Sequence, residues 1–233
     1  MVEPTILLFD IDGTLLSADG AGRRALVRAF AQVVGEGSAI ARADFRGMTD
    51  HALVRQSLSA QGLEPTDDLL EAILGRYVAA LDAELAVGST CLLPGVRELL
   101  ERLANAERSW VGLGLGTGNV EAGAHKKLTA VGLADYFAFG GYGSDHEDRA
   151  EVLAIGALRG ASWLGVARSK CRVVVIGDTR HDIDAAHRIG ARAVAVTTGG
   201  VDATRLLHAG ADAVFEDLSD PRICGFLLGT EQN

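Results

Sequence analysis

The spacing of short apolar segments limits the folds open to this chain more than any other feature. These segments are rich in Val, Ile and Leu, and stretches long enough for helices separate them. Strands that are apolar on both faces and alternate with helices are typical of a parallel sheet covered on both sides. The expected strands are residues 6–9, 111–115, 137–139, 173–176, 193–196 and 213–215.

The first interval between expected strands is much longer than the others. Between residues 9 and 111 the sequence shows helical patterns instead, at 21–34, 50–61 and 66–85. A crossover between parallel strands normally holds one helix, so three indicate an inserted helical module. We predict the α/β class: a Rossmann-like three-layer parallel-sheet core at residues 1–16 and 89–233, with an inserted all-helical domain at residues 17–88.

Composition and charge exclude several classes of protein. There are 22 basic and 31 acidic residues, a net charge of −9, so we expect neither a nucleic-acid partner nor an anionic membrane. No apolar run is long enough for a membrane span, and the first ten residues lack the features of a signal peptide. Cys91, Cys171 and Cys224 are far apart, which indicates reduced thiols in a cytoplasmic protein. The sequence leaves the oligomeric state open.

Two carboxylates directly follow the first expected strand, in the segment Asp10-Ile11-Asp12-Gly13-Thr14. Ligands of open α/β sheets bind beyond the carboxyl ends of the strands. Two carboxylates this close repel each other, and a bound divalent cation commonly compensates for this repulsion. One carboxylate can then act as a nucleophile while the other transfers protons. A polar turn that caps a helix is the alternative interpretation of these residues alone.

A hydroxyl flanked by glycines follows the strand expected at 111–115, in the segment Gly116-Thr117-Gly118-Asn119. A hydroxyl and the free N–H groups of a helix start are suited to holding a phosphate. A glycine-rich turn with Asn119 as helix N-cap is the plainer alternative. The loop also resembles that of methyltransferases that use S-adenosylmethionine, although an acid and a further glycine usual in that family are missing.

Two further carboxylates, Asp178 and Asp182, follow the strand expected at 173–176. Parallel strands bring their carboxyl ends to one edge of the sheet, so these acids should meet Asp10 and Asp12 there. Four converging acids need cations, and Mg²⁺ is the hard, oxygen-ligated choice. A structural role for Asp182 as a helix N-cap is the alternative.

Together the three motifs resemble those of the haloacid dehalogenase superfamily, in the branch that acts on phosphate esters. D-x-D-G-T after the first strand, Thr or Ser after the second and G-D-T-x-x-D after the fourth are that family's first, second and fourth motifs. Their order and spacing fit nearly the whole chain. The helical insert is similar to the cap of the subgroup that includes phosphoglycolate phosphatase and β-phosphoglucomutase.

The resemblance implies a role for each motif residue. Asp10 would attack phosphorus and form an aspartyl-phosphate, and Asp12 would protonate the leaving oxygen and then activate water. Thr117 and the amide of Gly118, beside Asn119, would hold the phosphoryl oxygens. The implied Mg²⁺ ligands are Asp10, the backbone carbonyl of Asp12, Asp178 and, through water, Asp182.

The sequence departs from the family at its third motif, where a lysine is expected about thirty residues after the second. Here Arg149, 32 positions after Thr117, is the natural substitute, since it can bridge a carboxylate and a phosphate. A surface salt bridge is the alternative role for this arginine. Lys126 and Lys127 compete with it, but ten residues of helix would place Lys127 about 15 Å along the axis, out of reach.

The segment Arg46-Gly47-Met48-Thr49-Asp50 lies between two helices of the insert. In the resembled subgroup this loop faces the active site, so Arg46 and Gly47 are candidate substrate-binding residues. Asp50 could accept hydrogen bonds from a sugar, or Thr49 and Asp50 could only cap the next helix. Mutases of the subgroup carry a histidine near Gly22 and an arginine near Asp50, and both are missing.

The predicted activity is Mg²⁺-dependent hydrolysis of a small phosphate monoester, of the phosphoglycolate or sugar-phosphate class. The second acid of the first motif is absent from the true dehalogenases of the superfamily, so Asp12 favours phosphate chemistry. The alternatives are a phosphomutase, a methyltransferase, and a phosphate-binding relative that has lost its activity.

Overall fold

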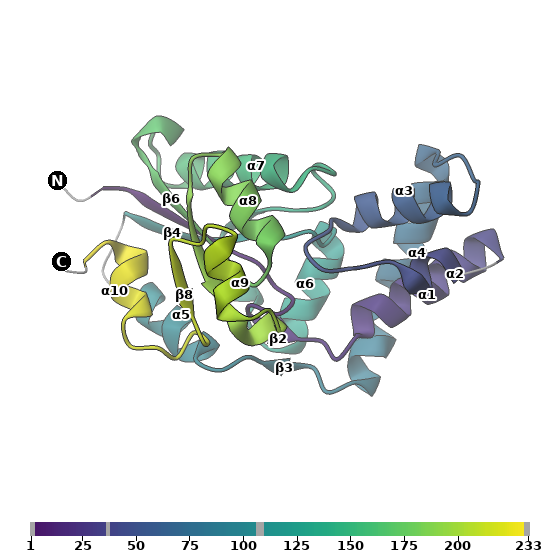
Figure 1. The fold of residues 1–233 in the computed structure, drawn as a ribbon, viewed down its shortest axis with the longest axis horizontal. Helices are drawn as coiled ribbons and strands as arrows, with labels where there is room; N and C mark the ends of the chain where they lie inside the picture. The colour runs from purple at the N-terminus through teal and green to yellow at the C-terminus, as the bar shows by residue number, and fades with distance from the viewer. Residues whose placement is uncertain (1–2, 36–37, 106–109, 231–233) are drawn as a thin grey trace.

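The computed structural model describes residues 3–35, 38–105 and 110–230, and a sheet of six parallel strands lies at its centre (Figure 1). The strand order is β5–β4–β1–β6–β7–β8, so β1 is central. The predicted α/β class and all six expected strands are confirmed, with the third shifted by two residues. The strands are β1 (Thr5–Phe9), β4 (Val111–Gly116), β5 (Phe139–Gly141), β6 (Arg172–Gly177), β7 (Arg192–Val196) and β8 (Ala213–Phe215).

Helices cover both faces of the sheet and complete the three layers. Alternate residues of β1 divide between two hydrophobic clusters: Ile6 and Leu8 pack with one layer of helices, Leu7 and Phe9 with the other. The first layer comprises α7 (Arg149–Trp163), α8 (Arg180–Arg188) and α9 (Ala203–His208). The second comprises α5 (Val96–Asn105), α6 (Glu121–Ala130) and α10 (Ile223–Leu228). Short 3₁₀ helices are η1 (Ala134–Tyr136), η2 (Arg168–Lys170) and η3 (Thr197–Gly199).

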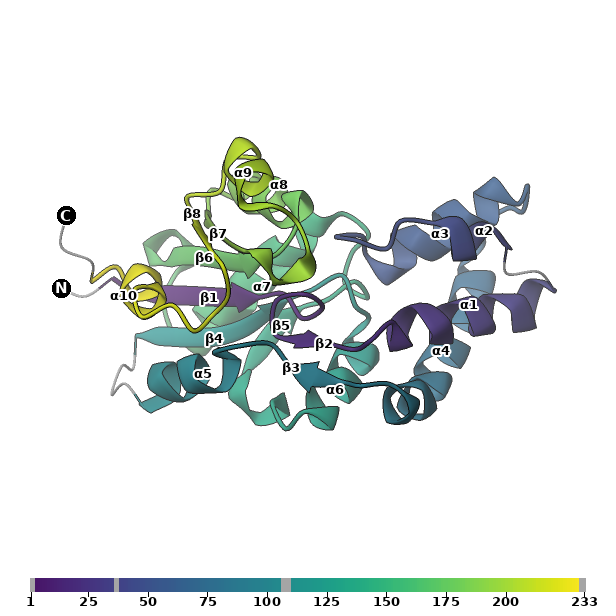
Figure 2. The same cartoon turned by 60° about the horizontal axis from the view of Figure 1, so that its bottom comes forward.

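Four helices stand apart from the sheet, beyond the carboxyl ends of its central strands (Figures 1 and 2). Three of them, α1, α3 and α4, match the helices expected between the first two strands, and α1 packs along α4. The fourth helix, α2, was not predicted. The sequence also did not predict the small antiparallel pair β2 (Leu16–Ser17) and β3 (Cys91–Leu92). The domain boundary at residues 17–88 stays a prediction. The helices are α1 (Ala21–Val34), α2 (Ser38–Arg42), α3 (Asp50–Ala60) and α4 (Asp67–Val87).

Glycines in β4 make room for the neighbouring layers. A Cβ added at Gly114 would collide with the ring of Phe139 in β5, and one at Gly116 would collide with Leu153 of α7. Both glycines lie inside the strand, and Gly114 pairs with Leu8 of β1. These two glycines therefore serve the packing of the sheet and are not part of the loop that follows it.

Within the described ranges, no helix is both long and apolar enough to cross a lipid bilayer.

The strand glycines yield a stability prediction. Gly114→Ala should lower the free energy of unfolding by about 1–3 kcal/mol, because the new methyl group overpacks against Phe139. Gly75→Ala is the matched control, since a Cβ at that exposed position of α4 meets nothing within 4 Å. It should stabilise the protein by up to about 1 kcal/mol through helix propensity. Urea unfolding of both variants tests the opposite signs; equal effects would contradict the close packing of β4 and β5.

Candidate active site

The turn after β1 carries the first two acids to the edge of the sheet. The Asp10 N–H donates to the carbonyl of Ile176 in β6 (2.9 Å), so this residue continues the sheet ladder. Gly13 has a φ of 83°, a conformation that favours glycine, and turns the chain out of the strand. Thr198, just beyond β7, donates from its hydroxyl to the carbonyl of Gly13 (2.6 Å) and fixes the turn from the side.

Three buried carboxylates meet at this edge. One oxygen each of Asp10, Asp178 and Asp182 lies within 4.8 Å of the other two. Burial and, after it, the charges of the neighbouring acids raise the pKa of Asp178 to about 8; burial likewise raises the pKa of Asp10. Any Cβ at Gly13 or Gly199 would run into the Asp178 carboxylate, so both positions must be glycine for this carboxylate to fit.

This group of carboxylates fits a divalent cation. It offers hard oxygen donors, and a cation among them would offset the repulsion and burial that disfavour their charged forms. Asp12 is not part of this group of three.

Asp182 also has a structural role, though not the one considered from the sequence. The N-cap of α8 is Thr179, whose hydroxyl accepts from the Asp182 N–H. The carboxylate of Asp182 accepts in return from the N–H (3.1 Å) and hydroxyl (2.7 Å) of Thr179. Asp182 is therefore the third helical residue of a capping box, and its Oδ2 is held in place at the site.

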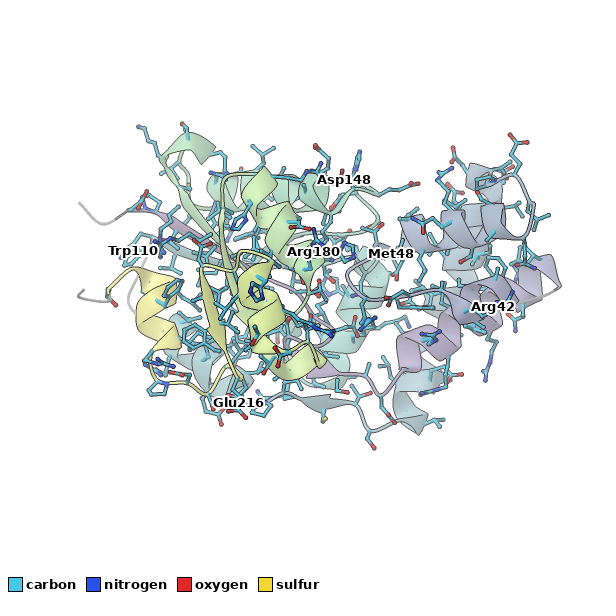
Figure 3. The ribbon with its side chains drawn as sticks, viewed as in Figure 1. Arg42, Met48, Trp110, Asp148, Arg180 and Glu216 are labelled. Carbon is cyan, nitrogen blue, oxygen red and sulfur yellow. The ribbon has the colours of Figure 1, made fainter. Side chains whose placement is uncertain are left out.

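Arg149 reaches the carboxylates, as its spacing predicts. It is the first residue of α7, and its Nη2 lies 3.0 Å from an oxygen of Asp10 and 2.5 Å from an oxygen of Asp182. Only 8% of its side chain is exposed, which excludes a surface salt bridge. The preceding residue, Asp148 (Figure 3), caps α7 and pairs with Arg188 of α8 at 2.8 Å, which anchors the start of the helix.

The turn after β4 brings Gly118 and Asn119 to the same place. Asn119 does not cap α6; Val120 occupies that position. The amide of Asn119 instead donates to an oxygen of Asp12 (2.9 Å) and to the hydroxyl of Thr117 (2.8 Å). Thr117 is fully buried beneath these two residues, while Gly118 and Asn119 line the cavity.

Lys127 also reaches the site, so the expectation that it lies out of reach is wrong. Its Nζ lies 2.6 Å from an oxygen of Asp12 and 2.7 Å from the side-chain oxygen of Asn119, and 4% of the side chain is exposed. α6 begins only at Glu121, so Lys127 lies about 9 Å along the axis rather than 15 Å. Helical side chains also lean toward the N-terminus, which shortens the remaining gap.

The loop before α3 closes the site from the side of the insert. Asp50 joins it to the turn after β4: its N–H donates to the carbonyl of Gly118 (2.8 Å), and its carboxylate accepts from the N–H of Val120 (2.9 Å). Thr49 is the N-cap of α3, so the capping alternative holds for this residue. Met48, labelled in Figure 3, lies where the loop meets this turn, and its carbonyl would block any side chain at Gly118.

Arg46 and Gly47 line the same cavity from this loop. Arg46 is exposed and pairs with Asp44 at 2.9 Å, so its guanidinium already has an acidic partner. Gly47, with a φ of 69°, packs directly against the ring of His181 in α8.

The cavity between insert and sheet has a volume of about 390 Å³ and is lined by residues of both. This size suits a small ligand. Four cationic side chains line it: Arg23, Arg46, Lys127 and Arg149. Buried acids at its floor and cations around it are suited to binding a cation together with an anionic substrate.

Residues 4–190 match the model of a protein family described as haloacid dehalogenase-like hydrolase. Because this match spans most of the chain, the protein belongs to the haloacid dehalogenase-like hydrolases. The family predicted from the three motifs is therefore confirmed.

Similar proteins agree with this assignment. A phosphoglycolate phosphatase from Pectobacterium atrosepticum is 28% identical over 202 residues, which are 83% of this chain and 80% of that protein. A hydrolase structure from Pseudomonas syringae has a TM-score of 0.66 at 24% identity and covers 94% of this chain and 95% of its own. A predicted phosphatase from Clostridium acetobutylicum gives 0.69 at 16% identity, covering 98% and 100%. The two structures share the fold; the family and the curated relative together indicate a phosphoric monoester hydrolase.

Asp50 makes the stability of the protein depend on pH. Burial raises its pKa to about 6, despite the nearby Lys127 and the N–H of Val120, from an ordinary value of 3.8. The folded protein therefore binds more protons than the unfolded chain between these values, and this contribution to the free energy of unfolding falls as the pH rises through them. Asp50→Asn keeps an acceptor for Val120 and removes the titration, so the variant should lose less stability between about pH 4 and about pH 6.

Urea unfolding at several pH values measures this difference. Asp44→Asn is the control, because hydrogen bonds from Arg46 lower the pKa of Asp44 to about 2, below the tested range. Parallel stability curves for Asp50→Asn and the unmodified protein would contradict the burial of this carboxylate.

Proposed function

We propose that the protein is an Mg²⁺-dependent phosphatase that hydrolyses a small phosphate monoester through an aspartyl-phosphate on Asp10. One observation carries the proposal: the buried carboxylate of Asp10 lies at the floor of the cavity, beside Arg149 and the carboxylates of Asp178 and Asp182. Membership of the hydrolase family and the phosphoglycolate phosphatase relative support it.

In the first step, an oxygen of Asp10 attacks phosphorus while the bond from phosphorus to the leaving oxygen breaks. Asp12, two residues on, donates the proton that this leaving oxygen needs. In the second step, Asp12 takes a proton from water, and the water oxygen attacks the same phosphorus. The bond to Asp10 then breaks, and inorganic phosphate and the original carboxylate result.

Positioning and charge carry most of such a transfer. Arg149 holds Asp10 and Asp182 at fixed distances and places a cation beside the attacked phosphorus. The N–H groups of the turn at Gly118 are the proposed donors to the phosphoryl oxygens. Thr117, whose buried hydroxyl accepts from the amide of Asn119, supports this turn from below, and Asn119 holds it against Asp12. Arg46 and Gly47, on the loop of the insert, would contact the rest of the substrate.

The metal would be held by the carboxylates of Asp10 and Asp178 and the backbone carbonyl of Asp12, with Asp182 supporting it. When bound, Mg²⁺ would neutralise the charge of the phosphoryl oxygens and of these acids. The phosphoglycolate phosphatase relative supports the finer substrate class, phosphoglycolate or a sugar phosphate, and the size of the cavity is compatible with it. The predicted cytoplasmic location stays a prediction.

Asp10→Asn tests the proposed nucleophile. Phosphate release from a panel of monoesters should fall by at least about a thousandfold, because an amide is a poor nucleophile toward phosphorus. Removing metal with EDTA should also abolish release, and added Mg²⁺ should restore it. Unchanged release by the variant would exclude the aspartyl-phosphate.

The same panel separates the remaining hypotheses. A mutase would transfer the phosphoryl group to a second substrate molecule instead of releasing it to water. A phosphate-binding relative without activity would bind metal and phosphate without turnover.

Arg149 gives a second test. Arg149→Met leaves Asp10 and Asp182 without their buried cation, which should lower the free energy of unfolding by about 3–5 kcal/mol and abolish activity. Arg149→Lys retains the charge but not the planar fork, so it should keep the fold and lose part of kcat. Thermal unfolding and phosphate release measure the two effects. Full activity in Arg149→Met would exclude a role for this residue in catalysis.

A further inference from the structure

The sequence motifs assign no role to Lys127, yet it lines the cavity and only 4% of its side chain is exposed. It lies on α6, on the opposite face of the sheet from Arg149. Its Nζ donates to Oδ2 of Asp12 and to Oδ1 of Asn119, at 2.6 Å and 2.7 Å. The lysine side of this ion pair is buried, whereas 44% of the Asp12 side chain is exposed. The two charge-assisted hydrogen bonds hold the ammonium beside Asp12.

Asn119 closes the arrangement. Its amide nitrogen donates to the same Oδ2 of Asp12, and its amide oxygen accepts from Lys127. Asp12, Asn119 and Lys127 thus form a closed triangle of hydrogen bonds. Two donors on one oxygen fix the rotation of the Asp12 carboxylate and leave Oδ1 for proton transfer.

The opposite wall leaves room for this ammonium. Gly22 of α1 faces Lys127, and a Cβ added there would lie 3.2 Å from its Nζ and 3.5 Å from its Cε. The ring of Tyr77 in α4 lies beyond, and its hydroxyl oxygen would be 3.8 Å from the same Cβ. A side chain at Gly22 would therefore crowd the end of the lysine that contacts Asp12.

We propose that Lys127 is a positioning residue that, with Asn119, holds the carboxylate of Asp12 in place for protonation of the leaving oxygen. This inference rests on the proposed phosphatase function. It adds a second cation that acts on a different carboxylate from the two that Arg149 contacts.

The dependence on the leaving group distinguishes this role from a structural one. An alkyl phosphate must be protonated as its alkoxide leaves, whereas 4-nitrophenolate leaves without a proton. Lys127→Met should therefore lower kcat/KM for an alkyl phosphate by about a hundredfold, the scale of general acid catalysis, and for 4-nitrophenyl phosphate by less than about threefold. The quantity kcat/KM is used because it reports steps up to departure of the leaving group.

Lys126→Met is the matched control. Lys126 is the adjacent residue of α6, but it pairs with Asp82 of α4 away from the triangle. Lys126→Met should change kcat/KM for neither ester. Gly22→Ala is the second variant, because it keeps the lysine and crowds its ammonium. It should lower kcat/KM for the alkyl phosphate, but by less than Lys127→Met does. It tests the contact even if Lys127→Met does not fold.

Equal losses on both esters in the Lys127 and Gly22 variants, or no loss, would overturn the positioning role. If the unmodified protein hydrolyses both esters, such a result overturns this inference alone. If the unmodified protein hydrolyses neither ester at any metal concentration, the proposed function and this inference both fail.

Discussion

Burial of like charges at one edge of the sheet is the constraint on which the rest of the site depends. Asp10, Asp178 and Asp182 lie within 4.8 Å of one another, and burial raises the pKa of the first two. Charged carboxylates this close in a buried place are unstable without compensating cations. The features around these acids answer this constraint. The helix starts and the glycines hold the carboxylates in place, and the basic side chains offset their charge.

Two cations from opposite layers serve the two acids of the first motif. Arg149 comes from α7 and contacts Asp10 and Asp182; Lys127 comes from α6 and contacts Asp12. Arginine is suited to joining two carboxylates, because its planar group offers several fixed donors, whereas lysine acts as a point charge. The position of β1 at the centre of the sheet makes this possible, because only a central strand is flanked by helices on both faces near its end.

Local signals in the sequence predicted most of this arrangement. Apolar runs located all six strands of the sheet. Three of the four acids expected to converge after β1 and β6 do meet, because parallel strands end at one edge, whereas Asp12 lies outside this group. The spacing from Thr117 located Arg149. Lys127 was missed because its reach depends on where α6 begins, four residues after Thr117, and on the lean of helical side chains. The short elements α2, β2 and β3 carry too few residues for a periodic signal.

The insert and the sheet meet through the turn that is proposed to hold the phosphoryl group. Asp50 accepts from Val120 and donates its N–H to Gly118, while Asn119, between them, binds Asp12. Three consecutive residues thus contact the loop of the insert on one side and the proposed acid on the other. A shift of the insert would move this turn, because one backbone hydrogen bond and one hydrogen bond to the Asp50 carboxylate join them directly. The loop proposed to face the leaving group and the turn proposed to face the phosphoryl group therefore have one shared geometry, and a substrate whose two ends do not match it would not satisfy both.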